Sequence, residues 1–215
     1  IIMLKFNNIT ALLLAALLLV ACQSGPDKAS PPKPEVAATP STEEPATEAE
    51  VVDFYQQFYE DAVASLKSGK TAQAVELLVQ VSNDAPDKPY VFTNLGLAYF
   101  KLQELDLAEQ AFKQAITRDD NDAVAHNHLG ILQRQKGQFK EAMNRYQRAI
   151  KIDSSYASAH LNLGILFDIY LQDLDLALRH YQNYQSLIGE EDTQVANWIV
   201  DIKRRLKSGT TKSQG

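Results

Sequence analysis

Apolar residues recur along this chain with the spacing of helices that bury one face. Two such faces lie near the ends of the patterned region, and each is made of four residues: Phe54, Phe58, Ala62 and Leu66, and later Val195, Ile199, Ile202 and Leu206. The second stretch carries Asp201, Arg204 and Arg205 on its opposite side. This pattern predicts amphipathic helices from the first face to the second.

The dipeptide Leu-Gly recurs at a fixed interval between these two faces. It occurs at Leu95-Gly96, Leu129-Gly130 and Leu163-Gly164, so the three glycines are evenly spaced. A period of this length is typical of a solenoid in which every repeat is a pair of helices. We therefore predict an all-α fold of stacked helix hairpins without a sheet.

The residues around each Leu-Gly pair resemble the tetratricopeptide repeat (TPR). In the segment 89–122 the matching residues are Phe92, Leu95-Gly96, Tyr99, Ala108, Phe112 and Ala115. The next repeat departs from the pattern at Gln133, and the one after it has Tyr184 in place of the last alanine. That later repeat also has one extra residue within 168–175, which predicts a longer turn between its helices. Counting back from Gly96 by the same interval gives a degenerate first repeat, with Ala62 at the glycine position.

The resemblance implies a right-handed α-solenoid with four repeats, at 55–88, 89–122, 123–156 and 157–188. Together they form a TPR domain over residues 51–188. Glycine and alanine are expected where two helices cross closely, and aromatic residues where repeats wedge together. We expect a capping helix within 189–207, with Trp198 covering the last hairpin, and a flexible tail at 208–215.

The N-terminal residues indicate export and a lipid anchor. Lys5 precedes the apolar run Ala11 to Val20, which has the length of a signal sequence rather than of a membrane span. The run ends in Leu19-Val20-Ala21-Cys22, which resembles the lipobox of bacterial lipoproteins. The resemblance implies a signal peptide at 1–21, acylation of Cys22 and, with Gln23 next, outer-membrane attachment facing the periplasm. The alternative is an ordinary secretory signal with an incidental cysteine.

Residues 22–50 are rich in proline, alanine, threonine and glutamate and lack aromatic residues, so we expect a disordered tether. Several other kinds of chemistry are disfavoured by the sequence. The net charge of −6 disfavours nucleic-acid binding. The stretch Ala64–Thr71 matches a loose phosphate-loop pattern but falls in an expected repeat turn, so we expect no nucleotide. The histidines lack metal-ligand spacing, and no catalytic signature occurs, so we expect no metal, cofactor or enzymatic activity.

In TPR proteins the first helix of each repeat lines a concave groove that binds partner proteins. Transferred by register, the resemblance implies a partner-binding groove formed by Tyr59, Val63, Leu66, Lys67, Thr93, Leu97, Phe100, Lys101, Asn127, Ile131, Arg134, Leu161, Ile165 and Asp168. Its apolar floor and charged rim suit a helix or an extended apolar segment. Two alternatives stay open. The aliphatic residues could pack within their own hairpins, and binding could use the convex face.

The sequence therefore predicts a lipid-anchored periplasmic scaffold for protein–protein interaction. Its layout resembles that of TPR lipoproteins that assist the assembly of pilus and secretion complexes. The alternative function is an adaptor that recruits or regulates a periplasmic protease or a peptidoglycan hydrolase.

Overall fold

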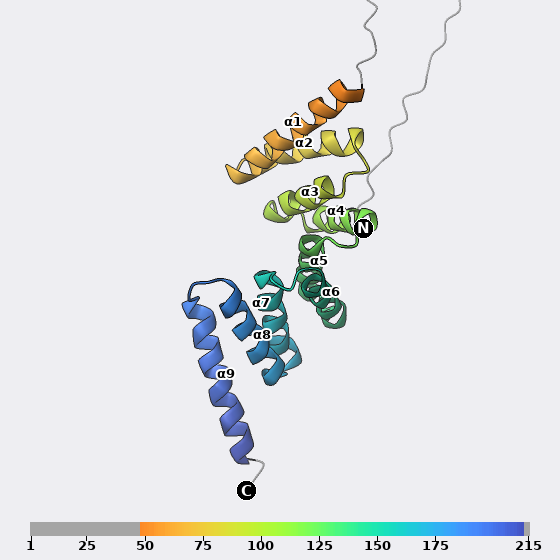
Figure 1. The fold of residues 1–215 in the computed structure, drawn as a ribbon. Helices are drawn as coiled ribbons and strands as arrows, with labels where there is room; N and C mark the ends of the chain where they lie inside the picture. The colour runs from red at the N-terminus through yellow and green to blue at the C-terminus, as the bar shows by residue number, and fades with distance from the viewer. Residues whose placement is uncertain (1–47, 213–215) are drawn as a thin grey trace, which may run out of the picture. The chain divides into compact units, whose positions relative to one another are not determined.

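A computed structural model describes residues 48–212 of the chain, and the surroundings of side chains within 55–208. The expected signal peptide, Cys22 and nearly all of the expected tether lie outside the described residues. Throughout residues 48–212 the regular structure is helical, and no strand occurs (Figure 1). The predicted all-α fold class is confirmed.

The helices of the described residues follow one another with short connections. Their bounds are α1 Glu48–Lys67, α2 Thr71–Asp84, α3 Pro89–Lys101, α4 Leu105–Arg118, α5 Ala123–Gln135, α6 Phe139–Ile152, α7 Ala157–Ile165, the π-helix η1 Leu166–Leu171, α8 Leu174–Leu187 and α9 Thr193–Lys212. Each odd-numbered helix up to α7 packs against the helix that follows it, so the domain contains four hairpins (Figure 1).

The hairpin turns repeat one backbone conformation. Gly69, Gln103, Gly137 and Gln172 all have positive φ angles, of 78°, 63°, 75° and 55°. They occupy the same place in successive turns, where the chain reverses between the two helices of a hairpin. Glycine suits this left-handed conformation best. In the first turn α2 begins at Thr71, and its N-cap is Lys70.

The Leu-Gly period reflects close crossing of the two helices in a hairpin. A Cβ added to the glycine would lie 2.6 Å from the nearest ring atom of the second helix in three pairs: Gly96 with Phe112, Gly130 with Tyr146, and Gly164 with Tyr181. Carbon atoms prefer separations of about 3.5–4.0 Å. Only glycine therefore allows the aromatic ring to pack directly on the backbone of the first helix.

The fourth hairpin accommodates its extra residue within the helix rather than in the turn. The π-helix η1 continues α7 and leaves only Gln172 and Asp173 before α8. The prediction of a longer turn is therefore wrong. A π-turn absorbs one added residue by widening the helix, so the aromatic packing of Tyr181 on Gly164 is kept despite the insertion.

The structure also shifts two expected boundaries. Helix α1 begins at Glu48, before the end at residue 50 that we expected for the tether. Helix α9 continues to Lys212, through residues expected to belong to a flexible tail. An established helix extends at a low cost per residue.

Helix α9 covers the last hairpin, as the sequence predicts. Val195 and Ile202 are fully buried in a core cluster that includes Tyr181. The rings of Trp198 and Tyr181 lie 5.4 Å apart. An ion pair of 2.8 Å joins Arg205 of α9 to Asp168 of η1. The apolar side of α8 is therefore closed within the chain.

Candidate functional site

The first helices of the repeats form one continuous surface. Helix α3 lies between α1 and α5 and contacts both, and α5 also contacts α7. A cavity of about 410 Å³ opens on this surface among α1, α3 and α5. We call it the groove cavity, and it is lined by Val63, Leu66, Lys67, Asn94, Leu97, Phe100, Lys101 and His128.

The repeat explains why these residues meet. On α1 and α3 the lining side chains recur at spacings of three and four positions and therefore share a face. Leu66 and Lys67 of α1 are equivalent, one repeat period later, to Phe100 and Lys101 of α3. Stacked repeats place equivalent residues next to one another. Val63, Leu66, Lys67, Leu97, Phe100 and Lys101 were all predicted groove residues, and the structure brings them together around the cavity.

Two aromatic contacts fix His128 at the cavity wall. Its ring stacks on Phe112 at 5.2 Å and meets Phe100 edge-to-face at 5.6 Å. The Nδ1 atom lies 2.9 Å from the carbonyl oxygen of Val124. A carbonyl can only accept, so Nδ1 carries the hydrogen and Nε2 keeps its lone pair. Burial lowers the pKa of His128, which favours this neutral form.

Asn94 is held both by α1 and by its own helix, α3. Its Nδ2 donates to Tyr59 Oη at 2.9 Å and to the carbonyl oxygen of Tyr90 at 2.9 Å. The rings of Tyr59 and Tyr90 pack edge-to-face, with centroids 4.8 Å apart, and burial raises the pKa of Tyr59. Tyr59, a predicted groove residue, thus supports Asn94 and is not part of the cavity lining.

Two lysines stand at the edge of the groove cavity. Lys67 and Lys101 are both exposed. Lys101 Nζ lies 3.5 Å from the carbonyl oxygen of Leu66. Neither lysine forms an ion pair with a side chain described between residues 55 and 208. Since no carboxylate lines the cavity, its edge carries uncompensated positive charge.

Two predicted groove residues lie in the interior instead. Thr93 and Asn127 are 8% and 2% exposed. Thr93 Oγ1 donates to Asp122, and Asn127 Oδ1 accepts from Asn162 Nδ2 at 3.0 Å. These bonds tie neighbouring repeats together and satisfy polar groups that would otherwise be buried at a cost. The structure therefore covers these two side chains and places them outside the groove cavity.

The predicted groove residues of the last two repeats mostly support the fold. Ile131, Leu161 and Ile165 pack, partly buried, against the core cluster around Tyr146 and Tyr181. Asp168 is paired with Arg205, as described above. Arg134 Nε donates to Tyr146 Oη at 3.3 Å, and the guanidinium lies 5.8 Å from the ring centroid of Tyr170. In this half of the domain, the alternative that aliphatic residues pack within the fold describes the structure better.

Asn94 and His128 were missed as groove residues by the sequence reasoning. A signal for them exists, because one repeat period separates Asn94 from His128 and the same period separates His128 from Asn162. All three are polar and share one register position in successive first helices. The predicted groove residues occupy other register positions of the repeat, which do not include this one.

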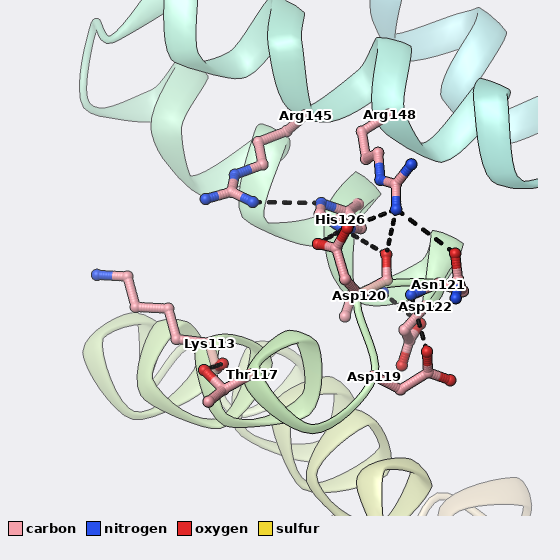
Figure 2. Close-up of polar contacts among 10 residues, drawn as sticks. Lys113, Thr117, Asp119, Asp120, Asn121, Asp122, His126, Arg145 and Arg148 are labelled. Carbon is pink, nitrogen blue, oxygen red and sulfur yellow. Dashed lines mark hydrogen bonds and ion pairs between the residues drawn. The ribbon is translucent and has the colours of Figure 1, made fainter.

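A second polar cluster joins the α4–α5 loop to α6 (Figure 2). Arg148 forms an ion pair with Asp120, which lowers the pKa of that carboxyl group. Arg145 Nη1 lies 3.3 Å from His126 Nδ1, and His126 Nε2 lies 3.1 Å from the carbonyl oxygen of Asp120. Arginine can only donate, so His126 accepts at Nδ1 and donates from Nε2. These contacts hold the α4–α5 loop against α6, so a structural role explains the cluster.

The described part of the chain contains neither a cluster of metal-ligating side chains nor a membrane-spanning helix. Within it, no three histidine, cysteine, aspartate or glutamate side chains come close enough together to hold a metal ion. No helix there combines the length and the apolar character needed to span a bilayer.

Comparison with known proteins identifies the repeats. The family model "Tetratricopeptide repeat" matches residues 89–122, and the model "TPR repeat" matches residues 132–167. No curated protein sequence matches the chain.

Solved structures with this fold include three informative neighbours. One is from work on the functional characterization of Pseudomonas aeruginosa pilF, with 18% identity and a TM-score of 0.64 over 76% of this chain and 74% of that one. MamA from Desulfovibrio magneticus RS-1 has 18% identity and a TM-score of 0.62, over 75% and 90% of the chains. The first TPR of Spaghetti (RPAP3), bound to an HSP90 peptide, has 21% identity and a TM-score of 0.51, over 53% and 90%. At these identities the likeness concerns the fold alone. The chain thus contains an all-α repeat domain in which residues 89–122 and 132–167 match models of tetratricopeptide repeats.

Proposed function

We propose that this chain is a lipid-anchored scaffold of the bacterial cell envelope that binds a partner protein in the groove cavity. Tetratricopeptide-repeat domains bind protein partners, and one structural neighbour holds an HSP90 peptide. The proposed role is binding rather than catalysis, in the assembly of an envelope complex. The partner meets the chain on the surface made by α1, α3 and α5.

The groove cavity is the single observation that carries this proposal. Val63, Leu66, Leu97 and Phe100 give it apolar walls. Its edge carries Lys67 and Lys101, neither of which forms an ion pair with a side chain described between residues 55 and 208. Its volume of about 410 Å³ falls within the range of about 300–1,000 Å³ that is typical of binding pockets. An apolar segment of a partner would exclude water from these walls, which is the main driving force of most protein association.

The proposed anchor rests on the sequence. The apolar run ending at Val20 and the following Ala21-Cys22 support cleavage before Cys22 and its acylation. Acyl chains on both the sulfur and the new amino group would satisfy the two-signal requirement for stable membrane attachment. Residues 23–47 would then link the lipid to α1. With Gln23 after the cysteine, the proposed location is the periplasmic side of the outer membrane.

The proposal is tested by partner capture with Phe100→Ala. Membranes from cells that express the tagged chain are crosslinked, and captured proteins are identified and titrated. Phe100 is half-buried in the cavity wall, so its loss should weaken capture by about 1–3 kcal/mol. Helicity, measured by circular dichroism, should be nearly unchanged. Lys70→Ala is the matched control, because Lys70 is exposed and does not line the cavity.

Two results would contradict the proposal. One is undiminished capture by Phe100→Ala. The other is loss of helicity in that variant, which would show that the ring serves the core. The identity of the captured protein also distinguishes the two functional readings. A stoichiometric membrane complex supports the assembly scaffold, whereas a soluble protease or peptidoglycan hydrolase supports the adaptor.

A further inference from the structure

The neutral polar side chains of the groove cavity use their donors inside the protein. Both amide hydrogens of Asn94 are committed, one to Tyr59 Oη and one to the carbonyl oxygen of Tyr90. The Nδ1 hydrogen of His128 is committed to the carbonyl oxygen of Val124. The polar atoms of these two side chains that are left without a hydrogen bond are Asn94 Oδ1 and His128 Nε2, and both are hydrogen-bond acceptors. Neither atom has a hydrogen-bond partner among the described residues.

This arrangement restricts the side chain that can occupy the cavity. The walls are otherwise apolar, so a large apolar group is favoured. A purely aliphatic group would cover the two acceptors without pairing them, which is costly. A tyrosine hydroxyl would bring an acceptor along with its donor. An indole has one N–H and no acceptor, so a tryptophan side chain matches the apolar walls and pairs one of the two acceptors without adding an unpaired acceptor of its own.

The edge of the cavity restricts what flanks that side chain. Lys67 and Lys101 occupy equivalent positions on α1 and α3, and both are exposed. Neither is paired with a carboxylate described between residues 55 and 208. Complementary charge across an interface guides both encounter and register. A segment with acidic residues beside the tryptophan would therefore fit this edge.

We propose that the groove cavity selects a tryptophan within an acidic segment of the partner. The indole packs against Phe100 and donates its N–H to His128 Nε2, while neighbouring carboxylates meet Lys67 and Lys101. This inference rests on the proposed function, because it names the chemistry of the segment that the groove binds. It assigns His128 a role in specificity, since the stack on Phe112 holds its ring at the wall.

The experiment measures peptide binding to the full chain, purified in mild detergent, by fluorescence anisotropy. The probe is a short labelled peptide with one central tryptophan followed by glutamates. A second peptide has 1-methyltryptophan, which keeps the ring and removes the N–H. We expect about fivefold weaker binding of the methylated peptide, because a typical hydrogen bond makes a net contribution of about this size. Replacing the glutamates with glutamine should weaken binding by about twofold to fivefold.

His128→Phe is the matched protein variant. Phenylalanine keeps a ring that can stack on Phe112 but has no nitrogen acceptor, and its fold is checked by circular dichroism. In this variant the two peptides should bind equally. Lys70→Ala, outside the cavity, should leave the discrimination unchanged.

Three results would overturn this inference. They are equal binding of both peptides by the unmodified chain, fivefold discrimination that persists in His128→Phe, and a tyrosine peptide that binds more tightly than the tryptophan peptide. Absence of peptide binding at millimolar concentration would also overturn it. The proposed function would survive all of these results if Phe100→Ala still weakened capture of the cellular partner.

Discussion

Replacing Gly130 with alanine should destabilise the domain even though alanine is the better helix former. The added Cβ would lie 2.6 Å from Tyr146 Cε1, 2.8 Å from Cδ1 and 3.1 Å from Cζ. The tyrosine ring is fully buried, and its hydroxyl accepts a hydrogen bond from Arg134. The ring therefore cannot turn away, and α5 and α6 must separate by about 1 Å to restore normal carbon contacts.

Two opposing contributions determine the size of this effect. Overpacking of a fitted core costs about 3 kcal/mol at the upper end of its usual range. Alanine gains about 1 kcal/mol over glycine within a helix. The net loss is then about 2 kcal/mol, which corresponds to a lower melting temperature by about 6 °C for a chain of this size. Urea unfolding followed by circular dichroism measures the free energy directly.

A second background isolates the clash. In a Tyr146→Leu chain the ring is absent, so Gly130→Ala should become neutral or stabilising by about 1 kcal/mol. Gly137→Ala is the control, because Gly137 has a φ of 75° and no atom near its would-be Cβ. Its backbone cost of about 1 kcal/mol should be the same in both backgrounds. The steric explanation is refuted if Gly130→Ala stabilises the unmodified chain, or costs as much without the ring as with it.

Three further predictions concern the anchor, the cap and pH. Cys22→Ser should release the chain from salt-washed membranes in cell fractionation, and normal retention would contradict the lipid anchor. A chain truncated after Ile188 should aggregate in size-exclusion chromatography or lose several kcal/mol of stability, because Tyr181 and its neighbours are no longer covered by α9. A truncated chain that stays monomeric with the same melting temperature would argue against the cap. Burial and the neighbouring His160 lower the pKa of His180 from 6.5 to about 4. As the pH falls, the unfolded chain therefore binds a proton at this histidine before the folded chain does. The free energy of unfolding should fall as the pH drops from about 6.5 to 4. In His180→Gln that slope of melting temperature against pH should be shallower, and an identical slope would disprove the linkage.

The main architecture could be predicted from sequence because its cause is local in sequence. A glycine that an aromatic ring must approach recurs in three successive repeats, so the interval from Gly96 to Gly164 indicates the hairpins directly. The extra residue of the fourth repeat was also visible. Its placement was not, because a helix can absorb one residue in a π-turn as readily as a loop can, and the packing of Tyr181 on Gly164 decides between them.

The site was predictable in register but not in side-chain environment. Equivalent positions brought Leu66 and Phe100 to one surface, as expected from the period. The same transfer also selected Thr93 and Asn127, which are buried and form hydrogen bonds between neighbouring repeats. The place of His128 depends on rings from both α3 and α4. Such an environment requires three helices to be positioned first, which periodicity alone does not provide.

Site-specific photocrosslinking of the chain in cells gives the sharpest test of partner binding in the groove cavity. A photoreactive amino acid is placed at Leu97, which lines the groove cavity, and separately at Leu107, which is exposed on α4 and does not line it. We predict that a discrete partner crosslinks at Leu97 and that Leu107 gives little of the same product. A partner that crosslinks at Leu107 and not at Leu97 would contradict binding in the groove.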